Sequence, residues 1–294
     1  LADGVVRVAG GLRYENVQLS VDDFQTLASY GSVQVEGGSP SFNDLLWNAG
    51  VIVEPVDGLR AYGSYAEGFT IADVGRILRG ITQTGVDVDD FLSLEPVVSN
   101  NRELGLEWNR GPLKASASYF WSSSDFGSLL VLRNDVFEVE RQPIEIEGFE
   151  ASLDWQTPLP GLSLSGGYAD LSGRTDSDDD GLVDDDLDGA NISPDRINLA
   201  ADYSSGAFST RVQARFYLPR EFNDLATVTD FEGYTLLDAF ISYRTDIGEF
   251  ALAAQNLTDE FYVTYDSDTV RVTDNSRFFA GRGRSFTLSW RGAF

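Results

Sequence analysis

Hydrophobic and polar residues alternate along much of the chain, in segments of about ten residues. In one such segment Phe208, Val212 and Phe216 fall on one side of an extended strand, and Arg211 and Arg215 fall on the other. This period of two predicts β-strands with one apolar face, and the segment length is typical of membrane-spanning barrel strands. A soluble sandwich also alternates, so the alternation alone does not decide between the two.

The pattern predicts about twelve strands, separated by connections that alternate between short and long. The strands are expected near 5–16, 44–54, 59–69, 101–109, 112–123, 144–156, 161–173, 196–204, 207–218, 233–245, 248–263 and 283–294. The short connections, rich in Gly, Pro, Asp and Ser, fall at 54–58, 109–112, 156–161, 204–207 and 245–248. The long ones fall at about 20–43, 70–100, 124–143, 174–195, 219–232 and 264–282. Outer-membrane barrels sort their loops in this way, with short turns on the periplasmic side and long loops outside.

The aromatic residues are in register with this turn pattern and predict two belts, one at each membrane interface. One belt lies near the short turns and consists of Trp108, Trp155, Tyr203, Tyr243 and the pair Trp290 and Phe294. The other lies several residues into the strands that lead outward and consists of Tyr14, Tyr65, Tyr119, Tyr168 and Phe216. Scattered core aromatics are the alternative explanation, but they have no reason to follow the turns.

Composition narrows the functional classes further. The 294-residue chain contains no His and no Cys, which removes imidazole and thiolate chemistry, so we do not expect an enzyme. Its net charge of −26 argues against nucleic-acid binding. No apolar run is long enough for a membrane-spanning helix. The chain begins without Met and its first residues already predict a strand, so we expect a piece of a longer protein.

Five segments form a set that occurs in one known family. They are LRAYGSYAEGFTIADVGRILRG (59–80), EPVVSNNRELGLEW (95–108), IEIEGFEASLDW (144–155), AAQNLTDEFYVTY (253–265) and GRGRSFTLSWRGAF (281–294). In this order, over essentially the whole chain, they resemble the barrel of TonB-dependent siderophore receptors.

The resemblance implies an all-β, antiparallel transmembrane barrel, of which residues 1–294 would be the C-terminal part of a 22-stranded whole. The N-terminal plug and about ten early strands would lie outside this chain. The implied function is TonB-energised uptake of ferric siderophores across the outer membrane of a Gram-negative bacterium, with TonB acting through the missing N-terminal region and with no cofactor required. Two alternatives stay open: a passive channel or small self-closed barrel, and a receptor for cobalamin, haem or a sugar.

Arginines are the candidate substrate-binding residues, because guanidinium groups attract anionic iron chelates. Four lie on the polar faces of predicted strands and two lie in the 70–100 loop: Arg13, Arg60, Arg211, Arg215, Arg76 and Arg79. The alternative for the strand arginines is pairing with lumen carboxylates, of which the candidates are Glu103, Glu107, Glu145, Glu147, Asp202 and Asp238. In the loop, Ile71, Val74, Ile77 and Leu78 have helical spacing, which fits either a substrate-gripping segment or local packing.

An acidic segment, TDSDDDGLVDDDLDG (175–189), has the spacing of a calcium loop. The candidate ligands are Asp176, Asp178, Asp180, Asp184 and Asp186. Gly181 stands at the sixth position, but the twelfth is Leu187 instead of the usual Glu. A solvated acidic loop is the alternative.

The last predicted strand ends in alternating large apolar residues, which the resemblance implies are read by the barrel-assembly machinery: Phe286, Leu288, Trp290 and Phe294. Outer-membrane lipid would contact the same face. Because the strands belong to a wider barrel, we expect no hydrogen bonds between the strand near 5–16 and the strand near 283–294.

Overall fold

The computed structural model describes residues 5–71, 73–91, 96–133, 136–178, 180–223, 229–269 and 279–292. Twelve long strands dominate it: β1 (Val6–Gln18), β4 (Ser41–Val56), β5 (Leu59–Thr70), β7 (Val97–Arg110), β8 (Leu113–Arg133), β9 (Val136–Gln156), β10 (Leu162–Thr175), β12 (Arg196–Ser205), β13 (Phe208–Tyr217), β14 (Tyr234–Thr245), β15 (Gly248–Gln255) and β16 (Ser285–Arg291). Each corresponds to one predicted strand, so the all-β prediction is confirmed.

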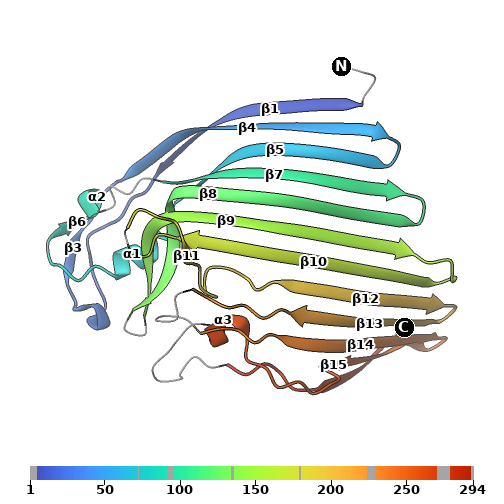
Figure 1. The fold of residues 1–294 in the computed structure, drawn as a ribbon. Helices are drawn as coiled ribbons and strands as arrows, with labels where there is room; N and C mark the ends of the chain where they lie inside the picture. The colour runs from blue at the N-terminus through green and yellow to red at the C-terminus, as the bar shows by residue number, and fades with distance from the viewer. Residues whose placement is uncertain are drawn as a thin grey trace.

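The strands form one antiparallel sheet in which each pairs with its neighbour along this series, from β1 to β16. Figure 1 shows them side by side in a curved sheet, with tight turns at one end and the helices and longer loops at the other. Within the described residues β1 and β16 lie at opposite edges and do not pair, as predicted from the sequence. The sheet is therefore an open arc, which contradicts the alternative of a small self-closed barrel.

The five short connections are tight turns, as predicted. Gly111 and Gly206 adopt φ angles of 63° and 57°, and a Cβ atom added at either residue would meet no atom within 4 Å. Backbone conformation, and not lack of space, therefore requires glycine at these two turns.

Three strand boundaries differ from the prediction by eight residues or more. Residues 124–143 do not form a long loop: β8 and β9 continue pairing to Arg133 and Val136, across an irregularity between Ser124 and Gly127. The strand predicted at 248–263 ends at Gln255, because Asn256 turns the chain with a φ of 50°.

Shorter elements fold at the loop end of the sheet. They are β2 (Phe24–Gln25), the 3-10 helix η2 (Ala28–Tyr30), β3 (Gln34–Glu36), α1 (Val74–Arg79), β6 (Val86–Asp87), α2 (Val88–Phe91), β11 (Asp185–Asp186) and α3 (Tyr265–Thr269). The segments β2, β3 and β6 make a small second sheet, in which β3 and β6 run parallel. None of the described helices has the length and apolarity needed to cross a membrane.

The two faces of the main sheet differ in chemistry. Following the strand register, the large exposed apolar residues fall on one face, here called the outward face. They include Val8, Leu12, Trp47, Leu104, Leu106, Tyr119, Phe149, Leu153, Trp155, Leu199, Val212, Ile241, Tyr243, Leu252, Phe286, Leu288 and Trp290. At the level of this apolar band, the opposite face, here called the lumen face, carries most of the ionic and hydroxyl side chains. An exposed apolar band of this extent is what a lipid-facing barrel wall requires.

Candidate ligand-binding lumen and outer mouth

An ion-pair chain crosses the lumen face of the first strands near the tight turns. Arg7 on β1 contacts Glu54 on β4, whose Oε1 also lies 3.1 Å from Nε of Arg60 on β5. Arg60 Nη1 in turn lies 3.0 Å from Glu107 Oε2 on β7. Cations and carboxylates thus alternate along four strands, and this part of the wall neutralises its own charge.

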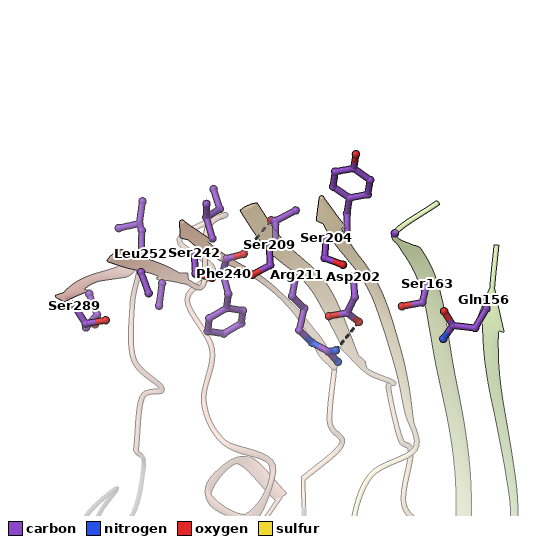
Figure 2. A pocket seen from close by; sticks show the side chains of 17 residues that line it. Gln156, Ser163, Asp202, Ser204, Ser209, Arg211, Phe240, Ser242, Leu252 and Ser289 are labelled. Carbon is purple, nitrogen blue, oxygen red and sulfur yellow. Dashed lines mark hydrogen bonds and ion pairs between the residues drawn. The ribbon is translucent and has the colours of Figure 1, made fainter. Parts of the chain in front are cut away.

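The later strands have a hollow of their own beside the tight turns. A hollow of ≈ 480 Å³ is lined mainly by small side chains of β10 to β16, including Ser163, Ser209 and Ser242. Arg211 lies beside Asp202, its partner on the neighbouring strand, with Nη1 2.7 Å from Asp202 Oδ2 (Figure 2). Small hydroxyl side chains thus line much of this part of the wall, whereas long charged side chains line the hollow of ≈ 570 Å³ beside the first strands.

A buried carboxylate organises the lumen face farther up β14. Asp238 is 1% exposed, and its Oδ2 accepts hydrogen bonds from Gln213 Nε2 at 3.0 Å and from Arg215 Nη2 at 2.9 Å. Its Oδ1 accepts the backbone N–H of Asn256 at 2.9 Å. The Asn256 side chain donates a hydrogen bond to the carbonyl of Glu260, so the AAQNLTDEFY segment forms a turn that is hydrogen-bonded to the wall through Asp238. Removing Asp238 would leave several buried donors unpaired.

All four predicted strand arginines lie on the lumen face, and each has a carboxylate partner. Besides the pairs of Arg60, Arg211 and Arg215, Arg13 Nε lies 2.9 Å from Glu15 Oε1. They belong to three strands, β1, β5 and β13, and do not converge on one point. The pairing alternative is thus present for all four, and substrate contact by any of them stays a prediction.

The predicted carboxylate partners are partly correct. Glu107, Asp202 and Asp238 pair with lumen arginines. Glu103 lies on the lumen face but accepts a hydrogen bond from the Tyr62 hydroxyl at 2.6 Å. Glu145 and Glu147 were assigned wrongly, because they are opposite Ser123 and Trp121 on the outward face. Glu147 and Glu145 continue the two-residue spacing of Phe149, which places them outward, although their charge favoured the lumen. Beyond the apolar band the other face of β9 is apolar, because Ile144 and Ile146 pack beside buried Leu187 and Ile192.

The two loop arginines belong to α1. Its apolar residues Val74, Ile77 and Leu78 pack in a cluster with buried Val35, Ile81 and Val88 and with other residues of the 20–43 segment. This contact supports the packing alternative for the helix. Arg79 is exposed at the end of α1, whereas the Arg76 side chain lies outside the described residues. Ligand contact by either residue stays a prediction.

Sequence reasoning missed an aromatic cluster at the lumen side of the mouth. Phe222, Phe231 and Tyr265 are buried together, with Tyr217 and Tyr234 packed against them. The rings of Tyr217 and Tyr234 are 4.4 Å apart, and burial raises the pKa of Tyr265. Tyr217 and Tyr234 occupy matching lumen positions at the ends of two paired strands, which is the one signal that the sequence contained.

A salt bridge joins this cluster to the neighbouring wall. Arg220 Nη2 lies 2.8 Å from Asp195 Oδ1, and Arg220 Nη1 donates to the Tyr265 hydroxyl at 3.4 Å. Both charged side chains are mostly buried, so this pair is less screened by solvent than the lumen pairs near the tight turns. The mouth on this side is therefore held by long-range packing and charge together.

The acidic segment follows β10 and brings three of its five predicted ligands together. Carboxylate oxygens of Asp176, Asp178 and Asp180 lie within 4.8 Å of one another. Asp176 is buried and accepts the backbone N–H groups of Asp180 and Gly181, both at 3.1 Å. Gly181 has a φ of 89°, which agrees with the turn expected at the sixth loop position.

The remaining two predicted ligands lie outside that group in the described part of the chain. Asp186 belongs to β11, and its Oδ2 accepts the backbone N–H of Asn223 at 2.9 Å. Asp184 is exposed. Calcium binding and its five-residue ligand set stay predictions, and three of the five carboxylates lie close together.

The acidic segment also contacts the last described loop. A Cβ at Gly189 would lie 1.8 Å from Thr269 Oγ1, so only glycine fits at this approach to α3. Burial raises the pKa of the neighbouring Asp188, although Asn191 Nδ2 donates a hydrogen bond to it at 2.7 Å. These contacts tie together two loops that are far apart in the sequence.

Three residues of the predicted assembly signal are placed. Phe286, Leu288 and Trp290 are 64%, 77% and 49% exposed on the outward face of β16, opposite Ala254, Leu252 and Phe250 of β15. Phe294 lies outside the described residues. The alternation predicted for this strand is therefore present, while its recognition by the assembly machinery stays a prediction.

Comparison with known proteins places this fold and lumen in one class. Residues 2–257 match the family described as TonB dependent receptor-like, beta-barrel, and the chain belongs to that family. Proteins of this family are outer-membrane transport receptors of Gram-negative bacteria and not enzymes, which confirms the localisation and class predicted above.

Individual relatives agree with this assignment. The chain is 24% identical over 310 aligned positions to the ferric aerobactin receptor of Klebsiella pneumoniae, covering 96% of this chain and 41% of that receptor. Its fold is similar to the copper transporter OprC, with a TM-score of 0.79 and 17% identity over 97% of this chain and 44% of the other. The ferric-catecholate import receptor Fiu from E. coli gives a TM-score of 0.69 at 20% identity, covering 97% and 42%. The chain thus spans about two fifths of the length of these relatives.

Proposed function

We propose that the protein containing this chain imports a ferric siderophore across the outer membrane, with energy supplied by TonB. The observation that carries the proposal is the similarity to the ferric aerobactin receptor along 96% of this chain. A polar lumen wall and a folded outer mouth are consistent with a large hydrophilic cargo. In this proposal the described strands form the wall, and the segments at the loop end contact the ligand first.

Ion-paired arginines can still bind an anionic chelate. Arg60 and Arg211 are 44% exposed, so a carboxylate or hydroxamate ligand can reach either guanidinium without breaking a buried pair. Arg79 is also exposed at the mouth. We propose that these cations attract the complex electrostatically and that the aromatic cluster beside Arg220 shapes the entrance.

Iron uptake by a deletion strain tests the proposal. Loss of the gene should abolish uptake of radiolabelled iron from one chelate in a panel that includes hydroxamate, catecholate and citrate types, and a strain lacking TonB should show the same loss. Uptake that persists without TonB would favour a passive channel. Unchanged iron uptake combined with lost uptake of cobalamin, haem or a sugar would replace the siderophore by that ligand.

We further propose two partners for the chain itself. Outer-membrane lipid should contact the outward apolar band, and the barrel-assembly machinery should read β16 together with Phe294. Deleting Phe294 should lower the amount of assembled receptor in the outer membrane, measured by heat-modifiable migration of the membrane fraction. Unchanged levels would remove the assembly role.

A further inference from the structure

Three successive lumen-facing residues of β13 carry hydrogen-bond donors. They are Arg211, Gln213 and Arg215, and the alternation of the strand places them on one face. Residues two apart in a strand are separated by about 7 Å, so this set extends over about 14 Å of the wall. The donors therefore form a line that follows one strand, from the mouth toward the tight turns.

A continuous chain of hydrogen bonds joins these three residues. Arg211 Nη1 lies 2.7 Å from Asp202 Oδ2, and Arg211 Nε donates to Gln213 Oε1 at 3.2 Å. Gln213 Nε2 and Arg215 Nη2 both donate to Asp238 Oδ2, at 3.0 Å and 2.9 Å. This chain, here called the donor track, is bound to a carboxylate on each neighbouring strand, which keeps its donors in a fixed order along β13.

The donor track differs in direction from the ion-pair chain of the first strands. That chain joins Arg7, Glu54, Arg60 and Glu107 across four strands near the tight turns. It stays near one end of those strands, so it offers no succession of contacts between the mouth and the tight-turn side. The donor track follows the strand instead, which is the direction in which a cargo must travel.

Each end of the donor track leads to a different part of the lumen face. At the mouth end, the next lumen-facing residue of β13 is Tyr217, which packs against Tyr234 in the aromatic cluster. At the other end the next one is Ser209, whose Oγ lies 2.7 Å from Ser242 Oγ in the hollow of ≈ 480 Å³ (Figure 2). A ligand that leaves Arg211 therefore reaches a hollow lined mainly by small side chains.

We propose that the donor track is the route along which the ferric chelate passes from the mouth to the tight-turn side of the lumen. Acceptor oxygens of the chelate bind first to Arg215, then to Gln213 and then to Arg211, before the chelate reaches the hydroxyl groups of the hollow. The inference rests on the function proposed above and adds to it the path of the cargo.

The chemistry of the donor track indicates which chelates can use it. Asp238 is buried, whereas the side chains of Arg215 and Arg211 are 37% and 44% exposed, so a ligand that reaches β13 meets guanidinium donors. These donors match chelates rich in carboxylate or hydroxamate oxygens. Two arginines and two aspartates leave the track without formal net charge, so it does not hold an anion tightly. Several weak sites in succession favour passage over retention, as in selective channels.

Separate measurements of surface binding and uptake test the proposal in cells that produce the full-length receptor. Binding of radiolabelled ferric chelate to cells without TonB reports the affinity of the mouth, and initial uptake by cells with TonB reports passage. Gln213→Leu should lower the uptake rate about five-fold, the size expected for one lost hydrogen bond, and leave surface affinity unchanged. Asn48→Leu is the matched control, because Asn48 is an exposed amide on the lumen face of β4, and it should transport like the unmodified receptor.

A second pair of variants tests the route by blocking space. Ser209→Trp combined with Ser242→Trp should fill the hollow below the donor track and lower the uptake rate more than Gln213→Leu does. The matched control replaces Ser116 and Ser152 by Trp, since their Oγ atoms are also 2.7 Å apart, on β8 and β9 outside the hollow. Heat-modifiable migration identifies the variants that assemble, and if Gln213→Leu does not, Gln213→Asn replaces it and should show a smaller loss of uptake.

Three results would overturn the donor track. They are unchanged uptake in the Gln213 and Ser209/Ser242 variants, equal losses of uptake in the matched controls, and a fall in surface affinity by the same factor as uptake. If the unmodified receptor takes up no ferric chelate at all, the proposed function itself is wrong and the inference falls with it. Normal uptake by the unmodified receptor and by every track variant would overturn the inference alone.

Discussion

The barrel wall and the outer mouth of this molecule are stabilised in different ways. In the wall, each long strand pairs with the next long strand along the chain. Apolar residues of the outward face, such as Val212 and Leu252, are exposed and require only contact with lipid. At the mouth, Val35 packs with Leu78 and Val88, and Phe222 packs with Tyr265, across long stretches of chain. The wall thus depends on a local periodic pattern, whereas the mouth depends on small buried cores that no sequence periodicity predicts.

The largest expected effect separates the two faces of the wall. Ala214→Arg, in the middle of β13 on the outward face, should cost about 2–4 kcal/mol of folding free energy in a bilayer. The matched control Ser165→Arg, on the lumen face of β10, should cost little. Denaturant titration of the receptor folded into vesicles measures both. Equal costs would contradict the assignment of the faces.

The second effect should be confined to the mouth. Ile81 is 2% exposed in the cluster beside α1, and Ile81→Ala should cost about 2 kcal/mol, the lower end for truncating a buried aliphatic residue. Limited proteolysis should show faster cleavage within the 20–43 and 70–91 segments, with the wall remaining heat-resistant. Simultaneous loss of wall stability would mean that the mouth and the wall unfold as one unit.

The third effect concerns the acidic segment of the mouth. Calcium should bind there with a dissociation constant of about 10⁻⁴–10⁻³ M, and saturation should add about 1 kcal/mol of stability. Asp178→Asn combined with Asp180→Asn should abolish binding, whereas Asp184→Asn should retain most of it, because only the first two belong to the clustered carboxylates. If calorimetry detects no heat of binding at millimolar calcium, the calcium prediction is wrong and the segment is a solvated acidic loop.

The smallest effect is a pH dependence of the same region. Because burial raises the pKa of Asp188, the folded mouth binds its proton more tightly than the unfolded chain does. Stability should therefore rise as pH falls toward this raised pKa and decline as pH increases through it. Burial also raises the pKa of Asp268, so its protonation changes the stability of the mouth in the same direction. Asp188→Asn should flatten the melting temperature against pH, and an unchanged slope would contradict this assignment.

The sequence predicted the wall well because lipid on one face and water on the other force a period of two. It failed where that asymmetry ends. Residues 129–132 are all apolar and do not alternate, so the sequence did not predict that β8 and β9 pair as far as Arg133 and Val136. Past Gln255 apolar residues follow at Leu257, Phe261 and Val263, which favoured a longer strand. They are out of phase with the apolar residues of β15, and the left-handed φ of Asn256 ends the strand.

The mouth could be predicted only in fragments. The spacing of Val74, Ile77 and Leu78 indicated α1, and the carboxylate spacing indicated the turn at Gly181. The contacts of these two segments could not be predicted, because they are distant in the sequence. Val35 packs with Leu78 of α1, and Thr269 lies against Gly189 of the acidic segment. For the lumen, residue type indicated which arginines face inward, while the pairing of Arg215 with Asp238 depends on the register of two strands.

The neighbour-to-neighbour order of the strands also determines when each part of the molecule can form. Hairpins such as β12–β13 and β14–β15 close over loops of a few residues, so the wall has low contact order and can assemble hairpin by hairpin. The parallel pairing of β3 with β6 is different, because it joins segments on either side of the β4–β5 hairpin. Closing that small sheet orders a longer stretch of chain than closing a hairpin does, so we expect the α1 side of the entrance to form late in biogenesis.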